Sequence, residues 1–106
     1  MQVLFDQGTP VPLRASLNAH EVETAYERGW SRLENGQLLT AAEEHGFDVL
    51  VTTDMNLKYQ QNLDVRRIAI VVLTTPSWPR INQTLESVIN AVGAAQPGSY
   101  IEVEIP

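Results

Sequence analysis

The chain has 106 residues, of which 43% are hydrophobic and 19% are charged. This length suits one domain with one core, and the composition excludes disordered and fibrous classes of protein. There are 13 acidic and 7 basic residues, which gives a net charge of -6. This balance argues against sequence-independent nucleic-acid binding, because neutralising phosphates requires a surplus of cations on the contacting face. We therefore expect a single domain over residues 1–106.

The sequence contains no cysteine, which excludes disulfides, thiolate zinc sites and thiol nucleophiles. Its first residues lack the basic segment and the long apolar stretch of a secretion signal. The longest apolar run, at residues 68–73, is far shorter than the ~18 to 20 residues that a membrane span requires. We expect a cytoplasmic protein with no membrane partner.

The first half of the chain alternates apolar runs with turn residues. The predicted elements are a strand at residues 3–5, a helix at 12–17, a strand at 20–24 and a helix at 37–44. The first strand ends at Asp6, before the turn-forming residues Gly8, Thr9 and Pro10. Asn35 is expected to cap the helix that follows it, and Gly46 to end that helix.

The second half continues the alternation. The predicted elements are a strand at residues 49–51, a helical turn at 57–63, a strand at 68–73, a helix at 81–92 and a strand around 100–105. Residues 68–73 are the most apolar stretch, so this strand should be central and buried on both faces. In the last strand Ile101, Val103 and Ile105 should point inward and Tyr100, Glu102 and Glu104 outward.

Strands that alternate with helices imply a largely parallel sheet with helices on both faces. We predict a three-layer α/β/α sandwich with a mostly parallel five-stranded sheet in the order 2-1-3-4-5, because right-handed connections favour this order. The order reverses direction between the first and third strands, and ligands bind beyond the carboxyl ends of the strands at such a point. Asp6 and Asp54 follow those two strands.

Two carboxylates that leave neighbouring strands, which lie ~4.8 Å apart, can share one hard cation such as Mg²⁺ or Mn²⁺. Such a cation can activate a water molecule for in-line attack on a phosphodiester. Asp6 and Asp54 are the expected ligands, with Glu34 or an acid of the following helix as a third carboxylate. Asn35 and Asn56 could add neutral oxygens. The alternative is that each Asp only caps a turn, since Asp readily accepts from nearby backbone amides.

Three segments resemble a known family: FDQGTP at residues 5–10, ENGQLL at residues 34–39 and VLVTTDMNL at residues 49–57. Together they are similar to the compact PIN-like proteins of the domain of unknown function 5615 group. The resemblance covers residues 2–73, and its most specific element is the third segment. It implies a Rossmann-like sheet and a metal-dependent ribonuclease activity, often that of the toxin in a toxin–antitoxin pair.

Asp6 matches the acid that ends the first strand in this family, and Asp54 matches the first acid of its Thr-x-Asp-x-Asp-Phe pattern. The second acid of that pattern is Asn56 here, and the acid that opens the helix is Asn35, with Glu34 one residue earlier. Two amides in place of carboxylates lower the charge that binds a divalent cation, so metal affinity and catalysis should fall.

Two functions therefore compete. The first is a Mg²⁺- or Mn²⁺-dependent ribonuclease in which Asp6, Asp54 and Glu34 are catalytic. The second is a catalytically silent PIN-like module that binds RNA or a partner protein. A third possibility is a small phosphate-ester hydrolase or a receiver-like domain. Of these two, the receiver-like domain is disfavoured. The first strand ends in one acid, and no lysine follows the later apolar strand.

Residues near the third strand and before the fourth are candidate ligands of an RNA substrate. They are Lys58, Arg66, Arg67 and Gln60. The basic residues could hold phosphates, and Tyr59 or Trp30 could stack on bases, although solvated charges are routine on polar connections. The alternating last strand offers a self-complementary edge, so we expect a homodimer, and a toxin would also have an antitoxin protein as its partner.

Overall fold

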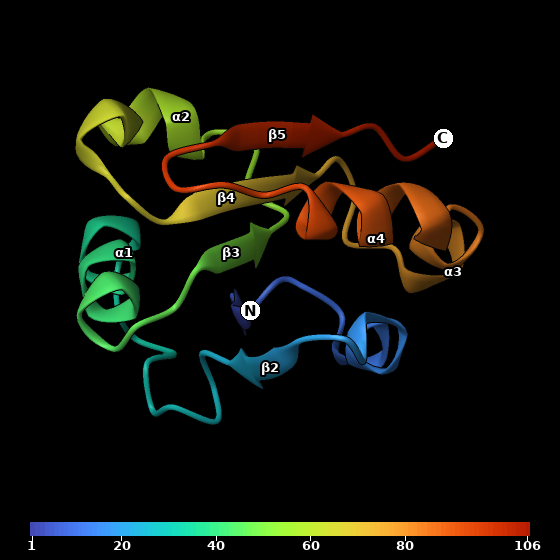
Figure 1. The fold of residues 1–106 in the computed structure, drawn as a ribbon, viewed down its shortest axis with the longest axis horizontal. Helices are drawn as coiled ribbons and strands as arrows, with labels where there is room; N and C mark the ends of the chain where they lie inside the picture. The colour runs from blue at the N-terminus through green and yellow to red at the C-terminus, as the bar shows by residue number, and fades with distance from the viewer.

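Five parallel strands form one sheet in the order β2-β1-β3-β4-β5 in the computed structural model, which describes residues 1–106. The strands are β1 (Gln2–Phe5), β2 (Glu21–Thr24), β3 (Val49–Thr52), β4 (Ala69–Leu73) and β5 (Tyr100–Val103). Helices lie on both faces of the sheet (Figure 1). The predicted sandwich and strand order are therefore confirmed.

The helices are short. They are the 3-10 helix η1 (Val11–Leu17), α1 (Asn35–Glu44), α2 (Leu57–Gln60), the 3-10 turn η2 (Leu63–Val65), α3 (Trp78–Asn82) and α4 (Leu85–Gly93). Figure 1 shows α1 and α2 on one side of the strands, and η1, α3 and α4 on the other. None of these helices has the length and apolar character needed to traverse a lipid bilayer.

The core forms two clusters separated by the sheet, because successive side chains of a strand point to opposite faces. Val3, Phe5 and the odd-numbered residues of β3 and β4 pack with η1, α3 and α4. Leu4 and the even-numbered apolar residues of β3 and β4 pack with α1 and α2. Every residue of β4 is buried, so the prediction of a central strand covered on both faces is confirmed.

The predicted helix at residues 81–92 is wrong as one element, because the chain forms α3 and α4 with a break between them. Thr84 has φ -130° and ψ 32°, which is not helical. Its amide donates to Ile81 O at 2.9 Å, a bond across three residues. Thr hydroxyls compete for backbone acceptors, and Thr84 Oγ1 also donates to Ile81 O. Ile89 of α4 is exposed and lies outside the core.

The predicted orientation of β5 is partly wrong. Val103 and Ile105 are buried as expected, but Ile101 is 45% exposed. Ile101 pairs with Val71 and so points to the face that α4 covers. The strand lies at the edge of the sheet, and no helix extends far enough to bury this side chain. Alternation predicts which face a residue takes, whereas coverage depends on where the packed helix lies.

Candidate functional site at the carboxyl ends of β1 and β3

Asp6 directly follows β1 and is surrounded by hydroxyl groups. Thr9 Oγ1 donates to Asp6 Oδ1 at 2.7 Å, and Thr52 Oγ1 donates to Asp6 Oδ2. Thr9 Oγ1 also lies 2.8 Å from Val51 O, so its single proton is shared between two acceptors. The side chains of Thr9 and Thr52 are buried. These contacts fix the orientation of the Asp6 carboxyl group.

Burial raises the pKa of Asp6 above its ordinary value, since the charged form loses solvation. Hydrogen bonds from the hydroxyls of Thr52 and Thr9, and from the backbone amides of Gly8 and Thr9, act in the opposite direction but do not cancel this effect. No lysine, arginine or histidine side chain of the protein forms an ion pair with the Asp6 carboxylate. A carboxyl group that lines a hollow and whose pKa is raised by burial is a candidate functional group.

Asp54 lies at the same end of the sheet and is joined to Asp6 through Thr52. The Asp54 amide donates to Thr52 Oγ1 at 3.1 Å, and that same hydroxyl donates to Asp6. Thr52 is the last residue of β3, which is hydrogen-bonded to β1. One hydroxyl group therefore fixes where the segments carrying the two acids lie relative to each other.

Asn35 and Gln60 continue this network on the other side of Asp54. Asn35 Nδ2 donates to Asp54 Oδ2 at 3.0 Å and to Gln60 Oε1 at 3.1 Å. The Asn56 amide donates to Asp54 Oδ1 at 2.9 Å, which is an Asx turn. Asp54 therefore has the turn-capping role that we weighed as the alternative to metal binding. That role uses one carboxylate oxygen, and the amide nitrogen of Asn35 occupies the other.

Glu34, and not Asn35 as predicted, is the residue that caps the amino terminus of α1. Asn35 is the first residue of α1, and Glu34 is the N-cap residue, with extended backbone angles of φ -74° and ψ 166°. The Glu34 amide donates to the side chain of Gln37 at 3.0 Å, as in a capping box. The prediction that Asn35 caps the helix is therefore wrong by one residue.

Glu34 borders the network without joining it. It lines a hollow of about 490 Å³ together with Asn35 and Gln60. No three His, Cys, Asp or Glu side chains lie close enough together to hold a metal ion. The site therefore has two carboxylates, Asp6 and Asp54, and its other polar groups are amides and hydroxyls.

Two hollows open beside Asp6. The first, of about 200 Å³, is lined by Asp6, Gln7, Ser31 and Asn35 among others. The second, of about 370 Å³, lies between the loops that follow β1 and β2, and Tyr26 is one of its walls. Sequence reasoning identified Asp6 and Asn35 but missed Thr9, Thr52 and Tyr26. The two threonines had a signal, since each lies within three residues of a candidate acid; Tyr26 had none.

Gly8 allows the loop after β1 to lie against the end of β3. A Cβ atom on this residue would lie 2.8 Å from Thr53 Oγ1 and 3.9 Å from Asp6 Oδ1. A contact of 2.8 Å is closer than such atoms approach in proteins, so a side chain here would displace the loop or Thr53. The close approach of the two loops beside Asp6 therefore depends on glycine.

The predicted basic ligands of RNA do not gather around the two aspartates. Lys58 Nζ pairs with Glu102 Oε2 at 2.9 Å, and Arg66 pairs with Glu43 at 3.0 Å. Arg67 precedes β4 and lies at the opposite, amino end of the sheet. Of the four predicted substrate ligands, only Gln60 contacts the Asp54 network, through Asn35.

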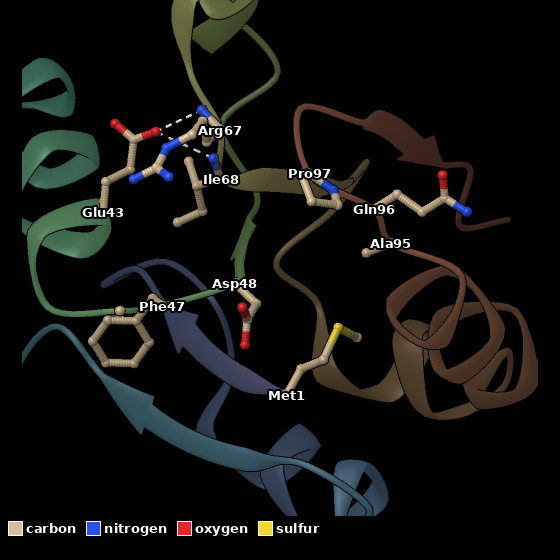
Figure 2. A pocket seen from close by; sticks show the side chains of 10 residues that line it. Met1, Glu43, Phe47, Asp48, Arg67, Ile68, Ala95, Gln96 and Pro97 are labelled. Carbon is tan, nitrogen blue, oxygen red and sulfur yellow. Dashed lines mark hydrogen bonds between the residues drawn. The ribbon is translucent and has the colours of Figure 1, made fainter.

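The hollow at the amino end is shown in Figure 2, where Glu43 accepts from the backbone amides of Arg67 and Ile68. It has a volume of about 270 Å³, and Asp48, Phe47 and Arg67 line it. Asp48 Oδ2 accepts from the Gln2 amide at 2.9 Å. These carboxylates hold backbone amides at strand starts, so their roles are structural.

Trp30, considered above as a stacking platform, packs against other side chains and also lines the smaller hollow beside Asp6. Its ring lies 6.0 Å from that of Phe47 and 5.1 Å from that of His45, measured between ring centroids. The Arg28 guanidinium lies 4.8 Å from the Trp30 ring. Tyr59, the other candidate for stacking, is 78% exposed on α2 but lines neither hollow beside Asp6, so the structure places it outside the candidate site.

Comparison with protein-family models, with curated proteins and with solved structures finds no match to this chain. The chemistry of the site must therefore be inferred from its own geometry.

Proposed function

We propose that the protein is a metal-dependent ribonuclease of the PIN-like type, with Mg²⁺ or Mn²⁺ bound at Asp6 and Asp54. The observation that supports this proposal is the Thr52 hydroxyl, which bonds both to Asp6 and to the backbone of Asp54 at the ends of two neighbouring strands. Ligand sites of parallel α/β sheets lie at such strand ends.

The residues present fit a hard cation in type, although their number is small. Mg²⁺ takes one or two carboxylates and keeps several waters, so Asp6 and Asp54 are a sufficient anionic set. Asn35 lines the same hollow as Asp6. If its side-chain amide gives up the hydrogen bond to Asp54 and rotates, its oxygen can face a bound metal. Asn56 is a further oxygen donor. When bound, the metal supplies an activated water and offsets charge on the leaving oxygen.

The chain's own contribution is to hold these groups in place. Thr9 and Thr52 orient the Asp6 carboxylate, and the Asn56 amide orients that of Asp54. Glu34, at the rim beside Asn35, is the third predicted catalytic acid and would act on water at the edge of the site. Gln60 positions Asn35.

The test is cleavage of single-stranded RNA in the presence of Mn²⁺ by the wild type and by a variant carrying both Asp6→Asn and Asp54→Asn. We expect the double variant to lose cleavage altogether, because it has no anionic ligand left at the two strand ends. Asp64→Asn is the matched control, since Asp64 is an exposed aspartate in η2 whose side chain bonds to neither Asp6 nor Asp54. Equal cleavage by the wild type and the double variant would reject the assignment.

A second function is favoured by a specific observation. Four of the seven basic residues, Arg14, Arg28, Lys58 and Arg66, are paired with acids, and Asn35 presents its amide nitrogen to Asp54. The Asn35 contact suits a catalytically silent PIN-like module that binds RNA or a partner protein, and the paired basic residues favour a partner protein over RNA. Calorimetric titration separates the two: no Mn²⁺ binding at millimolar concentration, together with tight binding of a macromolecule, assigns the silent module.

The proposed ribonuclease would act in the cytoplasm and, as a toxin, would be held inactive by an antitoxin protein. We also propose a homodimer that pairs through β5, whose outer edge is free for strand addition. Light scattering at several concentrations tests this, and a monomer at every concentration contradicts it.

A further inference from the structure

The larger hollow beside Asp6 has features that metal binding does not use. It has a volume of about 370 Å³ and lies between the loops that follow β1 and β2. Val11 and Tyr26 form apolar walls and are both exposed, Tyr26 by 76%. An exposed aromatic ring beside a partly buried acid offers a face on which a planar ligand can stack.

A network of hydrogen bonds holds the turn that carries Tyr26. The Thr24 amide donates to Glu27 Oε1, and the Glu27 amide donates to Thr24 Oγ1, each at 3.0 Å. Arg14 grips the same Glu27 carboxylate with two nitrogens, at 2.6 and 3.2 Å. Tyr26 lies inside this reciprocally bonded segment, so its backbone is fixed although its side chain contacts solvent.

The charges around the hollow favour a neutral occupant. The charges of Arg14 and Glu27 cancel in their ion pair, and the Asp6 carboxylate is the remaining charge in the lining of the hollow. A phosphate or an acidic side chain would be repelled by that carboxylate. Gln7, exposed at the same rim, offers both amide donors and an acceptor, as the hydrogen-bonding edge of a base requires.

We propose that this hollow binds an unpaired nucleobase, which stacks on Tyr26 and hydrogen-bonds to Gln7. The inference rests on the proposed function, because it places the base next to the phosphodiester that Asp6 and Asp54 would hold. It makes single-stranded RNA the preferred substrate, since a base within a duplex cannot reach the ring of Tyr26. Tyr26 is then a substrate-binding residue that acts without the metal.

Tyr59 provides a matched control for Tyr26. The two rings are almost equally exposed, at 76% for Tyr26 and 78% for Tyr59. Tyr59, however, lies on α2 with Lys58 Nζ at 5.2 Å from its ring centroid, and it is not among the residues that line the hollow beside Asp6. Substituting either residue removes the same amount of aromatic surface.

The experiment measures fluorescence anisotropy of an end-labelled, single-stranded RNA oligonucleotide in EDTA, so that binding is independent of metal and of cleavage. We expect Tyr26→Ala to raise the Kd at least about fivefold, the lower range for losing one base–aromatic stack. Tyr26→Phe keeps the ring and should bind as the wild type does. Tyr59→Ala should also leave the Kd unchanged. Thermal melting of each variant checks that it is folded.

Four outcomes overturn the inference. They are no RNA binding by the wild type, wild-type affinity in Tyr26→Ala, an equal loss in Tyr26→Phe, and an equal loss in Tyr59→Ala. A competition assay separates a base from a protein side chain as the occupant. Displacement of the RNA by adenosine or uridine supports the inference, whereas displacement by N-acetyl-tryptophanamide alone assigns the hollow to a protein partner and overturns it.

The failure of this inference and that of the proposed function give different results. Binding in EDTA that depends on Tyr26, without any cleavage in Mn²⁺, keeps the base site and rejects the ribonuclease. Cleavage that depends on Asp6 and Asp54, with unchanged RNA affinity in Tyr26→Ala, keeps the ribonuclease and rejects the base site.

Discussion

Asp6 and Glu43 are both partly buried carboxylates, one at each end of the sheet, and their surroundings differ. At the amino end, burial opposes the charge of Glu43, but hydrogen bonds from Arg66 and two backbone amides outweigh it and lower the pKa. At the carboxyl end, hydroxyl and amide groups around Asp6 do not outweigh burial, and the pKa is raised. The fold thus supplies Glu43 with a cationic partner and leaves the Asp6 carboxylate without one.

Among substitutions that keep both carboxylates, the largest expected effect concerns the hydroxyl that joins the two acids. Thr52→Val keeps the shape of the side chain but removes the hydrogen bonds to Asp6 and to the Asp54 amide. We expect Mn²⁺ affinity to fall about 10- to 100-fold, as for the loss of a group that orients metal ligands. Calorimetric titration measures it. Thr52→Ser should restore the affinity, and equal weakening in both variants would mean that packing, not the hydroxyl, matters.

The second prediction concerns Glu43. Glu43→Gln removes the charge that Arg66 and the amides of Arg67 and Ile68 share, so we expect a loss of about 1.5–3 kcal/mol in the free energy of unfolding. Urea denaturation measures this loss. Mn²⁺ binding should not change, because Glu43 lies at the other end of the sheet from Asp6. A drop in metal affinity would contradict the separation of the two ends.

The third prediction has the opposite sign. Asp6→Asn removes a carboxylate whose raised pKa means that its charge destabilises the fold at neutral pH. We expect the free energy of unfolding of the variant to equal that of the wild type or to exceed it by up to about 1 kcal/mol. The variant should also lose Mn²⁺ binding. Denaturation without metal gives the value. A clear loss of stability would mean that Asp6 is a structural cap.

The smallest effect is the dependence of stability on pH. Because the pKa of Glu43 is lower in the folded chain, its contribution is complete above its ordinary value of 4.5 and is lost as pH falls through the folded pKa. The difference in unfolding free energy between the wild type and Glu43→Gln should therefore shrink below pH 4.5. Denaturation at several acidic pH values measures this difference. A difference that stays constant with pH would show that the charge of Glu43 does not contribute to its interaction with Arg66.

The strand order and the buried character of β4 could be predicted because both follow from short-range patterns. An apolar run bounded by turn residues defines a strand, and handedness then limits the topology. Asp6 and Asp54 could be identified because each follows such a run. The break at Thr84 could not, since the apolar residues before and after it keep a helical spacing along the sequence.

Other parts of the site depend on contacts between distant segments. Asn35 bonds to Gln60 across 25 positions, and Thr52 bonds to Asp6 across 46. No local pattern encodes such distances. Arg66 and Arg67 were candidate phosphate ligands because they are basic and precede the central strand. Arg67 instead lies at the start of β4, at the amino end of the sheet. Arg66 lies along α1, where it contacts Gly36 O and Glu43.

The separation of the core by the sheet has a consequence for how this protein can change. The layer of α1 and α2 carries Asn35 and Gln60, so repacking it moves groups that contact Asp54 or its partners. Beneath the other face, α3 and α4 supply only apolar side chains to the core and none to the Asp54 network. The layer of α3 and α4 can therefore change in sequence, become longer or carry a fused segment without moving the side chains around Asp54.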